Sequence, residues 1–215
     1  MADSILDNCT LEELGRNNLK MYQLKDGFRF GMDSVLLSWF AASFVRGNSA
    51  NTNSSKVTSR NLKVLELGAG CGACSLLLAG RKPNVSIDSV ELMRTSYEVL
   101  SENIRLNNLE SRLNAYCYDI RNLGNEIRNI QYDIVMFNPP FFNKENGPKT
   151  TNQKSVERLN GRFEENGNLD DFVRIAASRV IPSSGYVVMI MHGERLSESI
   201  KLYMDNGLTP TNLMA

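Results

Sequence analysis

Histidine and cysteine, the side chains that most often bind transition metals, are scarce in this sequence. It has one histidine, His192, and four scattered cysteines, Cys9, Cys71, Cys74 and Cys117. Cys71 and Cys74 have the C-x2-C spacing of many zinc sites, but no second pair follows at a suitable distance. We therefore predict that the protein binds no metal and that Cys71 and Cys74 are small buried thiols near a glycine turn.

The sequence also lacks an excess of charge of either sign and any long apolar run. Its 24 basic residues balance 24 acidic ones, so a strongly basic nucleic-acid-binding protein is not indicated, although local basic patches remain possible. No segment approaches the ~20 apolar residues that cross a bilayer. The acidic amino terminus does not resemble a signal peptide. For 215 residues, we expect one domain overall, in the cytoplasm and without membrane contact.

Strand and helix patterns alternate regularly from residue 63 onward. Short runs of β-branched and apolar residues predict strands at 63–67, 85–90, 113–118, 133–137 and 185–191. Helical spacing predicts helices at 73–81, 93–107, 123–129, 169–180 and 196–206. Asn168 is expected to cap the fourth of these helices, with Asp170 and Asp171 in its first turn. This alternation predicts an α/β fold with a doubly wound, mainly parallel sheet and helices on both faces.

The residues before this pattern are expected to form a cap segment and a linker. The pattern of residues 11–25 is mixed, and we assign no helix or strand to them. Asp33 or Ser34 can cap a packing helix, whose apolar positions include Val35, Leu36, Trp39 and Phe40. Residues 47–61 are polar and predict a flexible surface connection. We therefore divide the chain into a cap segment with its linker, 1–60, and a sheet domain, 61–215.

A glycine turn joins the first predicted strand to its helix. The sequence Val64-Leu65-Glu66-Leu67-Gly68-Ala69-Gly70-Cys71-Gly72-Ala73 lets the backbone turn tightly and approach a ligand at a helix amino terminus. Glu91 ends the next strand, where an acidic residue can bind ribose hydroxyls. The turn fits a nicotinamide dinucleotide or S-adenosylmethionine. Glu66 favours the second, because an acidic residue there can help to hold an ammonium group that a dinucleotide lacks.

A second motif follows the buried strand 133–137. Asn138, Pro139, Pro140 and Phe141 come directly after it, and proline ends a strand because it cannot donate to the sheet. The carboxyl end of a strand is the usual place for chemistry in an open α/β sheet. The Asn138 side chain and the proline carbonyls supply uncharged acceptors, and Phe141 supplies a ring face. This set suits a planar group that carries an NH2; the alternative is a proline-rich turn with Phe141 and Phe142 in the core.

Taken together, the two motifs resemble the class I S-adenosylmethionine-dependent amino methyltransferases over about residues 63–191. The resemblance implies a Rossmann-like methyltransferase sheet in which Glu91 binds the cofactor ribose, Asp119 meets its adenine amino group and Ile120 packs on that ring. The Asn-Pro-Pro-aromatic motif would hold the target nitrogen. The predicted cofactor-binding residues are Phe30, Asp33, Glu66, Gly68, Ala69, Gly70, Glu91, Leu92, Asp119 and Ile120.

Within this group, residues 26–37 resemble the amino-terminal segment of the bacterial tRNA1(Val) adenine-N6 methyltransferases, which closes over the cofactor. Release-factor glutamine methyltransferases share the Asn-Pro-Pro-aromatic motif but carry a larger helical amino-terminal domain. Ribosomal RNA guanine-N2 methyltransferases often carry a duplicated domain, and no repeat is visible here. A methyltransferase sheet of this kind needs two more strands after the helix 196–206. We therefore expect a sheet truncated at the carboxyl end.

The resemblance predicts methylation of the exocyclic N6 of an adenine in tRNA by a monomer or weak homodimer. The predicted substrate-binding residues are Phe141, Lys144, Lys149 and Lys154. Phe141 offers its ring face, and the three lysines lie in a long polar loop beside the site, where cations can meet phosphates. A solvated surface loop is the alternative. A different amino target, a nicotinamide-dependent oxidoreductase and a cofactor-binding module without turnover remain open as other functions.

Overall fold

The computed structural model describes residues 5–27, 29–45, 60–139 and 167–215. Its centre is a five-stranded sheet in the spatial order β5-β4-β3-β6-β7, in which every neighbouring pair is parallel. The strands are β3 Leu62–Leu67, β4 Val85–Glu91, β5 Leu113–Cys117, β6 Ile134–Phe137 and β7 Tyr186–Met189. The predicted doubly wound parallel sheet is confirmed.

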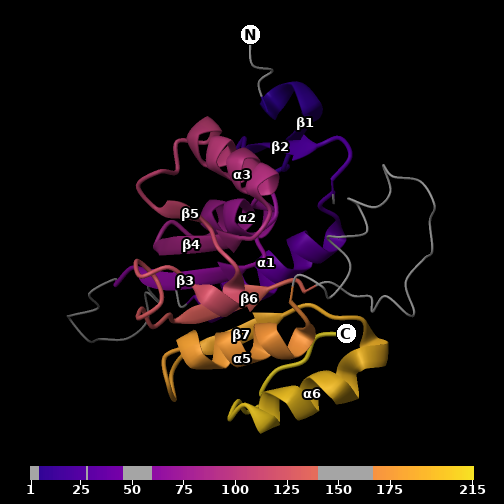
Figure 1. Cartoon of the computed structure of the whole chain (residues 1–215), viewed down its shortest axis with the longest axis vertical. Coiled ribbons are helices and arrows are strands. Elements are labelled where there is room, and N and C mark those ends of the chain that lie inside the picture. Colours follow the sequence, from indigo (N-terminus) through magenta and orange to yellow (C-terminus); the bar gives the residue numbers. More distant parts are fainter. Residues whose placement is uncertain (1–4, 28, 46–59, 140–166) are drawn as a thin grey trace, which may run out of the picture.

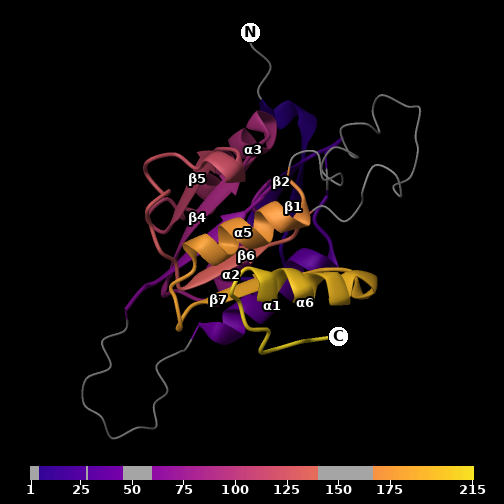
Figure 2. The same ribbon diagram turned by 60° about the horizontal axis from the view of Figure 1, so that its bottom comes forward.

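Helices cover both faces of this sheet (Figures 1 and 2). The helices are α1 Met32–Phe44, α2 Ala73–Arg81, α3 Arg94–Leu106, α5 Leu169–Arg179 and α6 Leu196–Asp205. Alternate side chains of β3 enter two separate cores, since Val64 packs in the cluster of α1, α2 and α3, while Leu65 and Leu67 pack in the cluster of α5 and α6. This alternation follows from the period of two along a strand.

The local signals for α2 and α5 are confirmed. α2 has the predicted bounds. Asn168 caps α5 in a capping box, where its side chain accepts from the backbone N of Asp171 and the Asp171 carboxylate accepts from the backbone N of Asn168.

Two predictions about helices were wrong. Gly31 is the N-cap of α1, so Asp33 and Ser34 lie inside the helix. Residues 123–129 form no helix: 125–129 are turns, and a short 3-10 helix, η2 Ile120–Asn122, precedes them. A Cβ on Gly124 would collide with the Tyr118 ring, and the Gly124 O accepts from the backbone N of Ile127 and of Arg128 in a turn that does not continue as a helix.

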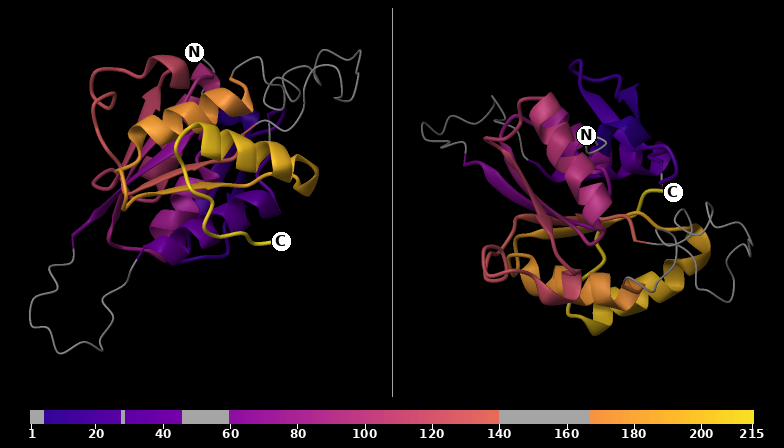
Figure 3. Two further views of the ribbon diagram at one scale, coloured as in Figure 1. Left: turned by 90° about the horizontal axis from the view of Figure 1, so that it is seen from below. Right: turned by 45° about the horizontal axis from the view of Figure 1, so that its top comes forward.

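The segment 11–25, to which the sequence assigns no element, forms most of an antiparallel hairpin. Its strands are β1 Cys9–Glu13 and β2 Lys20–Leu24, and it follows a 3-10 turn, η1 Ile5–Asn8. The free edge of β2 pairs with two asparagines, one in α3 and one at its C-cap. Asn103 exchanges hydrogen bonds of 2.6 and 2.9 Å with the backbone of Tyr22, and Asn107 exchanges bonds of 3.0 and 2.7 Å with that of Lys20. The hairpin therefore lies against α3 (Figure 3, right).

The remaining predictions about organisation fall partly outside the described residues. The polar connection 47–61 is described only at residues 60 and 61. After α6, the described residues 208–215 contain no strand. The division at residue 60 stays a prediction.

Candidate functional site

The carboxyl ends of the sheet strands gather the predicted site residues at one edge. The glycine turn after β3 stays beside β4, because the Ala69 N donates to the Val90 O at 2.9 Å. The end of β5 lies beside that of β4, since the Tyr118 N donates to the Glu91 O at 3.1 Å. The strand order reverses between β3 and β6, and ligands of open α/β sheets bind at such a switch point. The glycine turn and Asn138 flank it.

The three glycines of the turn differ in what surrounds them. Gly68, Gly70 and Gly72 have φ values of 69°, 56° and 93°, all in the left-handed region that favours glycine. A Cβ on Gly68 would touch the Phe172 ring at 3.3 Å, and one on Gly72 would collide with the Leu100 side chain. A Cβ on Gly70 would meet no atom of residues 5–27, 29–45, 60–139 and 167–215 within 4 Å. Gly70 is thus the member of the turn that faces open space.

Glu91 reaches this turn from the end of β4. Its Oε2 accepts from the Gly70 N at 2.8 Å, and its Oε1 accepts from the Met93 N at 2.8 Å. Burial raises the pKa of this carboxyl, and the backbone N–H donors act against that rise. Each oxygen keeps a further lone pair for a ligand donor. Glu91 therefore holds the turn in place and can also accept from hydroxyl groups.

Glu66 lies inside the protein against the first turn of α2. It is 3% exposed; its Oε2 accepts from the Ser75 N at 3.1 Å and from the Ser75 hydroxyl, which is itself 2.7 Å from the Ser89 hydroxyl. Burial raises the pKa of Glu66 to about 7. The structure thus gives Glu66 a role in fixing the helix that follows the glycine turn.

This raised pKa predicts a pH-dependent stability. The unfolded chain releases the Glu66 proton near pH 4.5 and the folded chain near pH 7, so the free energy of unfolding falls as the pH rises between these values. We expect Glu66→Gln, which mimics the protonated acid, to be more stable than the wild type by about 3 kcal/mol at pH 8 and by little at pH 4.5. Denaturant unfolding at both pH values measures this. Glu110→Gln, at an exposed position, is the control. If the gain in stability of Glu66→Gln at pH 8 were as small as its gain at pH 4.5, the raised pKa of Glu66 would be contradicted.

The other residues predicted for the cofactor lie nearby. The Leu92 O accepts from the Cys117 thiol at 3.8 Å, which joins the ends of β4 and β5. Ile120 is buried. Both Asp119 oxygens accept from the Arg121 guanidinium, which lowers the pKa of Asp119. A ligand amino group at Asp119 would compete with Arg121.

Phe30 and Asp33 belong to the amino-terminal segment. The Phe30 N donates to the buried Gln23 Oε1 at 2.9 Å, and its ring packs against the core that contains α1 and α2. Asp33 is near enough to Cys74, in the first turn of α2, to raise the pKa of that thiol together with stronger effects of burial and Glu66. The segment therefore runs past the start of α2, close to the glycine turn.

Asn138 follows β6 and has an unsatisfied acceptor. Its Oδ1 is buried, and no donor in the described part of the chain lies within hydrogen-bonding distance. A buried amide oxygen without a donor costs about 1–3 kcal/mol, so such an atom is a candidate for a ligand contact. Pro139 is buried beside it. Pro140, Phe141, Lys144, Lys149 and Lys154 lie outside the described residues.

Asn103 is a residue that the sequence did not point to. Besides pairing with β2, its amide donates to the Cys71 O in the glycine turn at 2.9 Å. It is fully buried in the middle of α3. One side chain thus joins the hairpin, α3 and the glycine turn. The available signal was an asparagine at helical spacing among the apolar residues Val99, Leu100 and Ile104 of α3.

The cysteines of the glycine turn are protonated thiols. Burial raises the pKa of Cys71 to about 11 and raises the pKa of Cys74 well above the ordinary value of a thiol. Within the described ranges, no group of three or more His, Cys, Asp or Glu side chains is placed to hold a metal ion. No helix in the same ranges is long and apolar enough to cross a membrane.

Comparisons with known proteins agree with this geometry. Residues 52–182, more than half of the chain, match the model of the family described as methyltransferase small domain. The chain is 25% identical over 128 residues to a tRNA1(Val) (adenine(37)-N6)-methyltransferase of Bacteroides fragilis, a match that covers 60% of this chain and 52% of the relative. It is 28% identical over 131 residues to the protein of that name from Serratia proteamaculans, with 60% and 48% covered. The chain thus spans about half the length of the curated relatives it matches.

Solved structures share the fold. An S-adenosylmethionine-dependent methyltransferase from Agrobacterium tumefaciens superposes with a TM-score of 0.59 at 20% identity, covering 96% of this chain and 60% of that one. Precorrin-6y C5,15-methyltransferase from Geobacter metallireducens superposes with a TM-score of 0.51 at 14% identity, covering 79% and 69%. With the glycine turn, the strand order and the match over residues 52–182, these findings give one conclusion: the chain belongs to the methyltransferase small domain family.

Proposed function

We propose that this chain is an S-adenosylmethionine-dependent N-methyltransferase that acts on the exocyclic N6 of an adenine in tRNA. The observation that carries the proposal is the buried Asn138 Oδ1 without a donor in the described part of the chain. Asn138 lies at the carboxyl end of β6, next to the carboxyl end of β3 where the glycine turn begins. The names of the curated relatives support tRNA as the substrate class. A cytoplasmic location and a monomeric or weakly dimeric state stay predictions.

The residues present suit the cofactor. Gly70 leaves open space beside the turn, and Glu91 offers acceptor lone pairs there. We assign Gly68, Ala69, Gly70, Glu91, Leu92, Asp119, Ile120, Phe30 and Asp33 to its binding site, and we assign Glu66 to positioning α2, with a direct contact as the alternative. Bound at the turn, S-adenosylmethionine supplies an electrophilic methyl group.

Asn138 and Pro139 orient the target amine in this proposal. An adenine must leave its stack to reach the edge of the sheet, and an unpaired base pays least for this. The Asn138 Oδ1 and the Pro139 carbonyl would then accept the two amino hydrogens, and Phe141 would stack on the ring. These bonds draw the nitrogen toward tetrahedral geometry and direct its lone pair. No strong base is required, because the proton becomes acidic only as the nitrogen gains positive charge.

Lys144, Lys149 and Lys154 are proposed to contact phosphates of the RNA, on the evidence of the sequence alone. Each phosphate that a cation neutralises releases counterions, so their contribution would appear in the salt dependence of RNA binding.

Calorimetry separates the two cofactor classes. The 215-residue chain is titrated with S-adenosylmethionine and, separately, with NAD. We expect a single site for S-adenosylmethionine and no heat of binding for NAD. Binding of NAD alone would replace the proposal with a nicotinamide-dependent enzyme.

Glu91→Ala is expected to weaken S-adenosylmethionine binding by roughly 1–3 kcal/mol, the scale of hydrogen bonds to a charged group. Both the ligand hydroxyls and the Gly70 N lose their acceptor. Calorimetry measures the affinity, and Glu110→Ala, at an exposed glutamate, is the matched control. An unaltered affinity in Glu91→Ala would leave Glu91 as a residue of the strand end only.

The role of Glu66 is decided by the same titration. If Glu66 only positions α2, Glu66→Gln should bind S-adenosylmethionine as the wild type does. A loss of affinity without a loss of stability would instead support direct contact with the ammonium group.

A further inference from the structure

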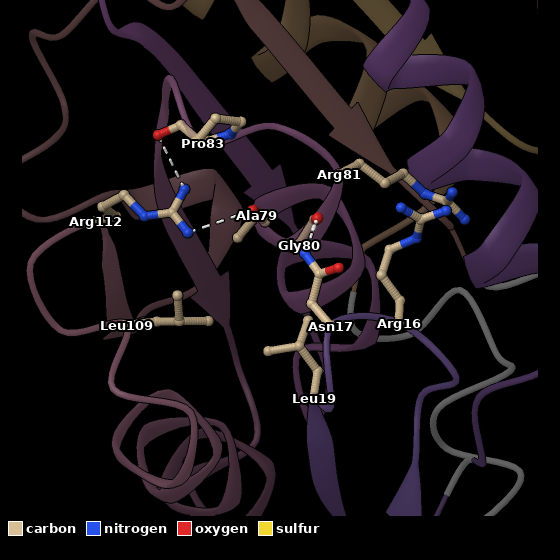
Figure 4. A pocket seen from close by; sticks show the side chains of 9 residues that line it. All are labelled: Arg16, Asn17, Leu19, Ala79, Gly80, Arg81, Pro83, Leu109 and Arg112. Carbon is tan, nitrogen blue, oxygen red and sulfur yellow. Dashed lines mark hydrogen bonds between the residues drawn. The ribbon is translucent and has the colours of Figure 1, made fainter.

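A pocket opens at the edge of the sheet opposite to the glycine turn. Its volume is about 510 Å³, and it lies between the β1–β2 turn, the end of α2 and the loops that lead into β4 and β5 (Figure 4). The residues that matter for its chemistry are Arg16, Asn17, Gly80, Arg81 and Arg112. Among the described residues, the lining contains three arginines and no carboxylate.

The walls of this pocket are held together by specific contacts. Asn17, with a φ of 48°, donates from its amide to the Gly80 O at 2.7 Å. A Cβ on Gly80 would lie 2.6 Å from Leu19 and 3.5 Å from the Arg16 stem, so the absence of a side chain at Gly80 lets the turn approach α2. Asn17 and Gly80 therefore fix where the Arg16 side chain begins.

The three arginines are not equivalent. Arg112 donates to the Ala79, Lys82 and Pro83 carbonyl oxygens at 3.1–3.3 Å, which satisfies the end of α2 as a cation at a helix carboxyl terminus does. Arg16 and Arg81 make no such bonds in the described part of the chain, and neither pairs with a carboxylate there. Their guanidinium groups converge (Figure 4).

Arg81 has a buried donor without an acceptor in the described part of the chain, and a like charge beside it. Its Nε is buried, and no acceptor among the described residues reaches it. Burial, and then the neighbouring Arg16 charge, lower the pKa of Arg81. Two like charges that share a pocket, one with a buried unused donor, would both be stabilised by an anion between them.

We propose that this pocket binds a phosphate group, with Arg16 and Arg81 as its ligands and Asn17 as a positioning residue. The planar fork of donors on arginine matches the oxygens of a phosphate. The phosphate belongs either to the backbone of an RNA or to a free phosphate or phosphomonoester. The pocket is about 14 Å from the glycine turn, because the nine residues of α2 run from one to the other. An RNA phosphate bound here therefore lies away from the target base. Of the two sources of the phosphate, only the RNA backbone rests on the proposed function.

The test compares Arg16→Gln/Arg81→Gln with Arg105→Gln/Arg174→Gln. Both double variants remove two positive charges, but Arg105 and Arg174 are exposed and form ion pairs on α3 and α5. Inorganic phosphate is titrated into each full chain by calorimetry at constant ionic strength, without cofactor. We expect one phosphate site in the wild type and the control, and at least about tenfold weaker binding in Arg16→Gln/Arg81→Gln.

Stability checks that the pocket variant folds and separates ligation from a structural role. Without phosphate, Arg16→Gln/Arg81→Gln should melt no lower than the wild type, since it removes a repulsion. Phosphate should raise the melting temperature of the wild type and leave that of this variant unchanged. A lower melting temperature of the variant without phosphate, together with unchanged phosphate affinity, would overturn the proposal.

The salt dependence of RNA binding identifies the source. For a single-stranded RNA oligonucleotide, the slope of log affinity against log salt should fall by about 0.7 for each RNA phosphate that the variant no longer neutralises. If this slope is less steep in Arg16→Gln/Arg81→Gln than in the wild type, the pocket is assigned to RNA. An unchanged slope with abolished phosphate binding assigns it to a free phosphate or phosphomonoester. Equal phosphate binding by the two double variants would refute the site, whatever the methyl transfer activity.

Discussion

Asn138→Ala is expected to reduce the single-turnover rate of methyl transfer by roughly 10²–10³-fold, the scale of losing one preorganised hydrogen bond to a reacting group. Its Oδ1 is buried without a donor in the described part of the chain, so it is available to the target amine. The missing bond matters chiefly in the transition state. Affinity for S-adenosylmethionine should therefore change little. Rapid-quench measurements with a labelled methyl group on tRNA give the rate.

Two further variants make this comparison specific. Asn138→Asp keeps an acceptor at the same reach and should be less damaging than Asn138→Ala. Asn129→Ala removes the same group from an exposed position ahead of β6 and should leave the rate unchanged. Equal single-turnover rates for the wild type and Asn138→Ala would refute the role of this side chain.

Gly70→Val is expected to abolish S-adenosylmethionine binding while leaving the fold largely intact. No atom of the described residues lies within 4 Å of a Cβ on Gly70, so the added side chain would displace the ligand without striking any of these residues. The backbone there has a φ of 56°, which a β-branched residue adopts only with strain. Calorimetry measures the binding, and circular dichroism and thermal unfolding measure the fold.

Gly15→Val is the matched control for this strain. Gly15 has a φ of 62° and equally open surroundings, but it lies at the β1–β2 turn. It should lose similar stability and keep its affinity for the cofactor. A folded Gly70→Val with unchanged affinity would show that the ligand does not approach this turn. Gly72 is a poor choice for this test, because a Cβ there would collide with Leu100.

The fold was predictable where local signals and tertiary packing agree. The glycine turn set both the end of β3 and the start of α2, and Asn168 with Asp171 set the start of α5. The amino-terminal hairpin was not predictable, because β2 is completed by Asn103 and Asn107, more than 80 residues away in the sequence.

Helix α1 shows why apolar residues alone can mislead. The sequence drew attention to Val35, Leu36, Trp39 and Phe40, yet Leu36 and Trp39 are exposed. The buried side of α1 instead contains mainly small residues: Ser34, Leu37, Ser38, Ala41 and Ala42. Small side chains let α1 pack closely on α2, and Ser38 satisfies its own hydroxyl on the Val35 O at 3.0 Å.

The candidate site was predictable as a location and less so in its contacts. Parallel strands bring their carboxyl ends to one edge, so the order of motifs along the chain placed Gly70, Glu91 and Asn138 together. The ion pair of Asp119 with Arg121 is local, between the N-cap and the second residue of η2. By contrast, the contacts of Glu66 with Ser75 and of Arg16 with Arg81 depend on side-chain packing across separate elements. No spacing in the sequence reports such contacts.

Mass spectrometry of nucleosides tests the central claim most directly. The 215-residue chain is incubated with tRNA and methyl-labelled S-adenosylmethionine, with Asn138→Ala in parallel, and the RNA is digested to nucleosides. We predict labelled N6-methyladenosine from the wild type and a strongly reduced yield from Asn138→Ala. Label in guanosine or in protein, or equal N6-methyladenosine from both chains, would contradict the account.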